Sequence, residues 1–185
     1  MTHMTNDPSF TIHPLDQMLW IRLNSRGCFL NSAKLKAVVE NYQKQGGNYC
    51  VIDLELCPGV DSTFMGTLIG LSNLCDSAGG KLQLISPTER TRSAMESLGL
   101  DMIIDIDPTD EEWFSQIDQI RKSIEEKDET ENLIEDKNYN EIEQAHHVLK
   151  AHRDLSALNE ENKQHFEYVC ESLEEEIRLS EGKQE

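Results

Sequence analysis

The run from Val51 to Gly66 constrains the fold more than any other part of the sequence. The β-prone residues from Tyr49 to Leu54 predict a strand, and Pro58-Gly59 predicts a turn after it. An Asp-Ser-Thr sequence then opens a segment with apolar residues at helical spacing. We expect Ser62 to start this helix as its N-cap, with its hydroxyl near free backbone N–H groups and the positive end of the helix dipole.

Strands and helices alternate along the first part of the chain. The expected strands are residues 10–13, 18–23, 49–54, 81–85 and 102–106. The expected helices begin at Asn31 or Ser32, at Ser62 and at Thr88, and they end near Gln45, Gly79 and Leu98. This order predicts an α/β fold with a mixed sheet, mostly parallel beyond an N-terminal hairpin and flanked by helices. Such sheets carry functional loops at the carboxyl ends of their strands, and residues 55–62 form one of these loops.

Acidic residues are concentrated in the second part of the chain. Up to residue 107 there are 12 acidic and 8 basic residues, net −4, and from residue 108 there are 23 and 9, net −14, which together give −18. We expect a frayed N-terminus over residues 1–8, a folded domain over 9–127, a linker over 128–140 and an acidic helical hairpin extension over 141–185.

Apolar stripes mark three helices after residue 108. Thr109 and Glu112 have the spacing of a capping box, and the stripe from Trp113 to Ile124 should dock on the domain. The next two stripes run from Ile142 to His152 and from Phe166 to Ile177. Because each stripe is narrow, these helices should pair as a hairpin, dock on the domain or pack against another chain, including a second copy in a homo-dimer.

Charge and composition exclude several classes of protein. A net charge of −18 without a basic stripe argues against nucleic-acid binding. No apolar run reaches the roughly 18 residues that a membrane span needs, and the N-terminus lacks a basic-then-apolar signal pattern. The five cysteines contain no C-x-x-C pair and are expected to be reduced thiols. These features predict a cytoplasmic protein without membrane contact.

Neither a metal site nor an enzyme is expected. The histidines His146, His147, His152 and His165, with Cys170, invite a metal interpretation. However, His146 and His152 are six residues apart, which does not place them together on one helix face, and Cys170 lies on an apolar stripe. We expect no metal and no other cofactor. Because a G-x-S-x-G motif, a P-loop and an activated nucleophile are all missing, we expect a binding protein rather than an enzyme.

Four motifs, in order, resemble the STAS domain of bacterial anti-sigma factor antagonists. Val51-Ile52-Asp53-Leu54 ends a strand, Asp61-Ser62-Thr63 starts a helix, Ala78-Gly79-Gly80-Lys81-Leu82 leads into the next strand, and Gly99-Leu100 precedes the last one. The resemblance covers roughly residues 9–125. It implies the STAS arrangement of sheet and helices and a role in protein–protein binding.

The resemblance also implies a modification site and two partners. In this family the serine after the aspartate is phosphorylated by an anti-sigma factor that is a serine kinase, and is dephosphorylated by a PP2C-type phosphatase. By position that serine is Ser62. The implied partner-binding residues are Asp61, Thr63, Phe64, Met65 and Asp53. The family's Asp-Ser-Ser/Thr-Gly-Leu-Gly reads Asp-Ser-Thr-Phe-Met-Gly here, so the docking surface is bulkier.

Alternatives remain open on the residues alone. Ser62 as a plain N-cap would contribute about 1 kcal/mol to stability. Phe64 and Met65 fit core packing as well as partner docking. We expect a phosphorylation-controlled binding module in a bacterial partner-switching pathway, which binds the anti-sigma kinase when Ser62 is unphosphorylated. The alternative is a STAS scaffold or adaptor subunit of a larger assembly, whose Ser62 region binds a partner without phosphorylation.

Overall fold

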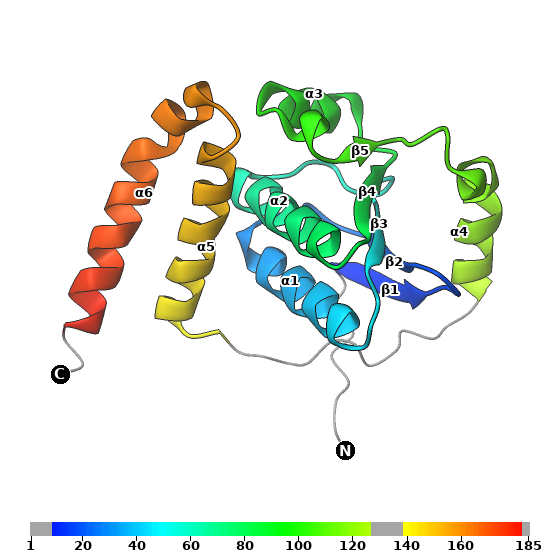
Figure 1. Cartoon of the computed structure of the whole chain (residues 1–185), viewed down its shortest axis with the longest axis horizontal. Coiled ribbons are helices and arrows are strands. Elements are labelled where there is room, and N and C mark those ends of the chain that lie inside the picture. The colour runs from blue at the N-terminus through cyan, green and yellow to red at the C-terminus, as the bar shows by residue number, and fades with distance from the viewer. Residues whose placement is uncertain (1–8, 127–138, 183–185) are drawn as a thin grey trace, which may run out of the picture.

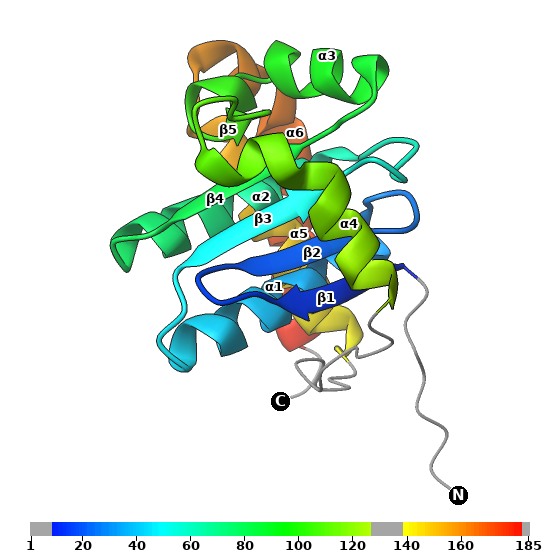
Figure 2. The same cartoon turned by 90° about the vertical axis from the view of Figure 1, so that its right-hand side faces the viewer.

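A five-stranded sheet forms the centre of the molecule (Figures 1 and 2). The computed structural model describes residues 9–126 and 139–182. The strands are β1 Phe10–Pro14, β2 Leu19–Leu23, β3 Tyr49–Asp53, β4 Lys81–Ile85 and β5 Asp105–Ile106, in the spatial order β1-β2-β3-β4-β5. The β1–β2 pair is antiparallel and every other pair is parallel. The predicted α/β fold with a mostly parallel mixed sheet is therefore confirmed.

Helices cover both faces of this sheet. They are α1 Phe29–Lys44, α2 Ser62–Ser77, α3 Glu89–Ser97, α4 Ile117–Glu126, α5 Glu141–Ser156 and α6 Glu160–Glu181, with 3-10 turns at Leu100–Met102 and Glu112–Gln116. Helices α1 and α2 lie behind the sheet in Figure 2, and α4 lies in front of it. None of the helices within the described residues is long and apolar enough to cross a membrane.

Strand β2 divides its side chains between the two faces. Leu19, Ile21 and Leu23 enter the large core under α1 and α2, whereas Trp20 enters a smaller core under α4. The indole of Trp113 meets that of Trp20 edge to face, with 5.6 Å between the ring centroids. The α4 stripe, with Ile124 buried, thus docks on the domain as its spacing predicts.

Several predicted boundaries are wrong, one because of a local cap and two because of contacts with other elements. Helix α1 begins at Phe29 with Cys28 as N-cap, and Asn31 lies one turn in, where its side chain accepts the N–H of Cys28 at 2.9 Å. The last strand is shorter than predicted, since the buried Leu100 turns into the core through a 3-10 turn. The predicted Thr109 capping box does not form: Glu111 precedes the 3-10 turn, and its carboxylate pairs with Lys81 of β4.

Helices α5 and α6, together called the hairpin below, pack against each other and against the domain (Figure 1). Leu155 of α5 and Phe166 of α6 belong to the same buried cluster as the α1 and α2 side of the sheet. Asn162 reaches the domain as well, because its side-chain amide donates to the carbonyl of Leu98 at 2.8 Å. The hairpin therefore completes the main core. The predictions for residues 1–8 and for most of the 128–140 linker lie outside the described residues.

Candidate functional site

The loop between β3 and α2 lies at the carboxyl end of the sheet and is tied to the segment before α1. Gly27 donates its N–H to Gly59 at 3.0 Å and accepts the N–H of Asp61 at 2.9 Å. A side chain at Gly27 would meet the ring of Phe64, 2.8 Å from a Cβ atom at that position. The absence of a side chain at Gly27 lets the two segments approach, and this fixes where α2 begins.

Asp61, rather than Ser62, caps helix α2. Its Oδ1 accepts the N–H of Phe64 at 2.8 Å, which is the usual N-cap bond. Its Oδ2 accepts the N–H of Phe29 at 3.0 Å, in the first turn of α1. One carboxylate thus satisfies free N–H groups at the starts of two helices, where both helix dipoles favour a negative charge. The expectation that Ser62 is the N-cap is wrong.

Ser62 is the first residue of α2, and its hydroxyl points to the hairpin instead of to the helix backbone. Ser62 Oγ lies 3.1 Å from Nε2 of His152 in α5. Nδ1 of His152 lies 2.9 Å from the carbonyl oxygen of Val148, to which only an N–H can donate. In the neutral ring Nε2 is therefore the acceptor, and the Ser62 hydroxyl donates its proton to it.

Helix α5 approaches α2 closely one turn beyond Ser62. A Cβ atom at Gly66 would overlap the carbonyl oxygen of Ala151. On the same side, Nε2 of His147 lies 2.8 Å from Ser32 Oγ and 3.3 Å from Thr67 Oγ1. Burial, with a smaller contribution from the charge of Lys36, lowers the pKa of His147 to about 4, so this ring is neutral at pH 7.

Most of the residues expected to bind a partner are covered. Phe64 is 1% exposed and packs in the main core, and Met65 is 6% exposed. Thr63 is also buried, as is Asp53. In this arrangement these four side chains offer a partner almost no surface. Asp61 and Ser62 are half-buried and lie together at the start of α2.

Asp53 stabilises the opposite face of the sheet. Its carboxylate accepts two hydrogen bonds from the guanidinium of Arg121 in α4, at 2.7 and 2.9 Å, and lies 3.9 Å from Nε of Arg22. It also accepts the N–H of Glu55 at 3.0 Å, which anchors the start of the β3–α2 loop. The charge of a fully buried carboxylate is thus offset by two cations. The structure places Asp53 in this network and away from Ser62.

The sequence interpretation missed three residues at this site. His152 contacts the hydroxyl of Ser62. Phe29, whose N–H bonds to Asp61, is 48% exposed, and Leu30, which follows it in the chain, is 71% exposed. An apolar pair directly after the Gly27-Cys28 loop could have indicated an exposed patch. Nothing in the local sequence indicates His152, because 90 residues separate it from Ser62.

The histidines of the hairpin make separate contacts. His165 packs edge to face on Phe166 with 4.7 Å between the ring centroids, and His146 lies 3.2 Å from a Glu181 carboxylate oxygen. Within residues 9–126 and 139–182, no three His, Cys, Asp or Glu side chains gather in a way that could hold a metal ion.

Comparison with known proteins agrees with this architecture. The family model of the STAS domain matches residues 9–113. The crystal structure of TM1081 from Thermotoga maritima, described as a candidate anti-sigma factor antagonist, is 21% identical with a TM-score of 0.52, and the match covers 60% of this chain and 94% of that one. This likeness shows a shared fold.

A second solved structure is more distant. SpoIIAA, described as a Bacillus cell fate determinant and solved in its phosphorylated form, is 18% identical with a TM-score of 0.47, over 60% of this chain and 99% of that one. No curated protein matches the chain. The family match spans more than half of the sequence and contains the sheet, α1, α2, α3 and the Ser62 loop. The chain therefore belongs to the STAS domain family.

Proposed function

We propose that the protein is an anti-sigma factor antagonist-type binding module in a bacterial partner-switching pathway, and that Ser62 is its phosphoacceptor. In this proposal an anti-sigma factor with serine kinase activity binds the unphosphorylated protein in the cytoplasm and phosphorylates it. A PP2C-type phosphatase reverses the modification. One observation carries the proposal: Ser62 is the first residue of α2, beside Asp61, and because Asp61 caps the helix the Ser62 hydroxyl is not needed as a cap.

The position of Ser62 suits a charge switch. A phosphate adds about −1.5 to −2 charge, and the start of a helix tolerates it because free N–H groups and the dipole favour an anion. The domain is thus expected to stay folded. The same charge would lie next to the Asp61 carboxylate, which contacts the exposed Phe29, and Leu30, the next residue, is exposed as well. A partner docked on this patch would meet repulsion and a desolvation cost.

The test is the intact mass of the full chain after incubation with an anti-sigma kinase and ATP. We expect the wild type to gain one phosphate and Ser62→Ala to gain none. Thr63→Ala is the matched control, since Thr63 is the adjacent hydroxyl but is buried. If Thr63→Ala is not phosphorylated and Ser62→Ala still is, the phosphoacceptor is Thr63 and the assignment of Ser62 is wrong. No phosphate on the wild type would reject the switch.

A second candidate function is a scaffold or adaptor that binds a partner without phosphorylation. The observation that favours it is the hydrogen bond from Ser62 to His152, which gives the hydroxyl a structural role. Binding measured with Ser62→Asp separates the two functions. A switch predicts weaker binding to the kinase, whereas a scaffold predicts partner binding that is unchanged. Homo-dimer formation through the hairpin stays a prediction, to be checked by the molar mass in solution.

A further inference from the structure

The hairpin covers the end of α2 that carries the proposed phosphoacceptor. We call the side of α2 formed by Ser62, Gly66, Thr67 and Gly70 the Ser62 face, and α5 packs along it (Figure 1). At Gly66 the two helix backbones touch without an intervening side chain. Such an approach positions α5 closely and places His152 against the Ser62 hydroxyl.

His152 contacts the hydroxyl group that a kinase would have to reach. The ring is buried, its Nε2 lies 3.1 Å from Ser62 Oγ and accepts a hydrogen bond from it, and it packs on Phe166 with 5.3 Å between the centroids. Phe166 belongs to α6, so both helices of the hairpin support this ring. A kinase must reach the hydroxyl with a phosphate donor and a base, and in the observed arrangement α5 covers one side of the half-buried Ser62.

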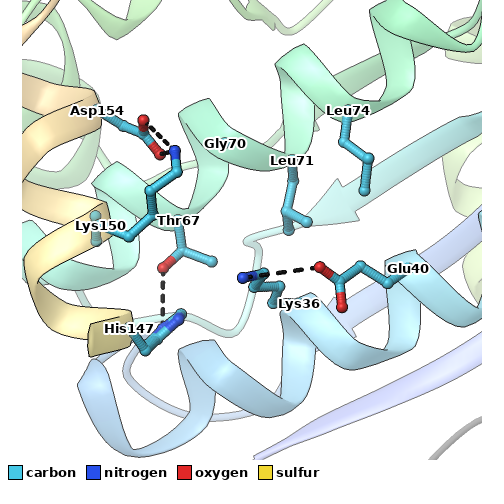
Figure 3. Close-up of a pocket in the computed structure, with 10 residues that line it drawn as sticks. Lys36, Glu40, Thr67, Gly70, Leu71, Leu74, His147, Lys150 and Asp154 are labelled. Carbon is cyan, nitrogen blue, oxygen red and sulfur yellow. Dashed lines mark hydrogen bonds and ion pairs between the residues drawn. The ribbon is translucent and has the colours of Figure 1, made fainter. Parts of the chain in front are cut away.

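The contact between the hairpin and α1 includes the 2.8 Å approach of His147 Nε2 to Ser32 Oγ, but it leaves a cavity beside this contact. A cavity of about 210 Å³ lies between α1, α2 and α5, lined in part by Lys36, Leu71 and His147 (Figure 3). The ion pairs at its edge stay within single helices, Lys36 with Glu40 in α1 and Lys150 with Asp154 in α5. These charges therefore do not fasten α5 to the domain.

Polar contacts also join the two helices of the hairpin to each other. Arg153 of α5 donates to the Glu174 carboxylate of α6 at 2.8 Å, and His146 lies 3.2 Å from Glu181. Since these links join α5 to α6, the two helices can leave the Ser62 face together while their mutual packing is kept.

From these contacts we infer that the hairpin is an intramolecular cap on the Ser62 face, and that the half-buried Ser62 becomes fully accessible when the hairpin moves off α2. A partner must then compete with a segment of the same chain. The inference rests on the proposed function, because it concerns access to the proposed phosphoacceptor. It adds a second level of control, in which anything that shifts the hairpin changes how fast Ser62 can be modified.

The test measures access to position 62 without a kinase. Ser62→Cys in the full chain is treated with a maleimide, and the labelling rate of that thiol is followed by peptide mass spectrometry. Gly66→Ala is then added: it favours the α2 helix by itself but drives a methyl group into the Ala151 carbonyl. We expect labelling to rise about tenfold, because overpacking against backbone shifts the docking equilibrium by about that factor.

Gly70→Ala is the matched control. It lies one turn further along the same face, where the new methyl group would meet only the movable carboxylate of Asp154 at 3.0 Å. Labelling should stay near the Ser62→Cys rate. Ala151→Leu applies the same strain from the hairpin side and should act like Gly66→Ala. Hydrogen exchange of the β2 and β3 amides checks that each variant keeps its sheet.

Two results would overturn the inference. One is an equal labelling rate with and without Gly66→Ala and Ala151→Leu; the other is an equal rise in Gly70→Ala. Either outcome leaves the proposed function to its own test, since maleimide needs no kinase. Conversely, a chain that no kinase phosphorylates can still show the cap.

Discussion

Asp61 offers the sharpest test of how the site is built, because one side chain starts two helices. Replacing it by alanine removes the bond from the Phe64 N–H at 2.8 Å and the bond from the Phe29 N–H at 3.0 Å. Loss of an N-cap costs about 1 kcal/mol, and loss of the second hydrogen bond, which is exposed to solvent, costs about as much again. We expect Asp61→Ala to lower the free energy of unfolding by about 2 kcal/mol.

Urea unfolding followed by tryptophan fluorescence measures this loss. With a slope of about 2 kcal/mol per molar urea, the midpoint should fall by about 1 M. Asp61→Asn keeps an oxygen for Phe64 but has no second oxygen for Phe29, so it should lose about half as much. Ser62→Ala should lose less than Asp61→Ala, because it removes only the bond to His152. The reverse order would refute the assignment of Asp61 as the cap.

Two further predictions concern buried charge. Arg121→Met leaves the fully buried Asp53 with Arg22, at 3.9 Å, as its remaining cation. We expect it to lower the free energy of unfolding by about 3 kcal/mol in the same urea assay. Lys122→Met, at an exposed position, is the control, and a loss of less than about 1 kcal/mol in Arg121→Met would contradict the network. His147 has a pKa of about 4 in the folded protein against an ordinary value of 6.5, so its neutral form stabilises the fold above pH 6.5, and that contribution is lost as the pH falls from 6.5 towards 4. After allowance for partial exposure of the ring, we expect the free energy of unfolding to fall by about 2 kcal/mol over this pH range in the wild type and to lack this fall in His147→Gln. Parallel curves of stability against pH for the wild type and His147→Gln would refute this prediction.

The elements of the domain could be predicted because their signals are local. Thr88 caps α3, and β4 has the predicted bounds. In each case a cap residue or an alternation within a few positions determines the boundary. Asp61 and Ser62 are both good cap residues next to each other, and local sequence cannot rank them. The choice depends on Phe29, whose N–H needs an acceptor and lies 32 residues away in sequence.

The position of the hairpin could not be predicted in the same way. The stripes of α5 and α6 indicate that each helix must bury one face, and three possible surfaces fit that requirement. The deciding feature is on α2, where Gly66, Thr67 and Gly70 leave room for another helix. Gly66 belongs to the family motif, but the space that its missing side chain leaves is filled by Ala151 of α5, which lies outside the motif. For the same reason the contact between Ser62 and His152 had no sequence signal.

The main core is completed late in synthesis, because Leu155 and Phe166 lie near the C-terminal end of the sequence. The ribosome adds about 5–20 residues per second, so the sheet with α1 and α2 emerges seconds before the hairpin does. During that interval the Ser62 face is bare on every newly made chain, and the core lacks two of its buried side chains. On the inference that the hairpin caps the Ser62 face, a partner present at the site of synthesis would meet an uncapped protein, so the time since synthesis would affect which surface the molecule presents.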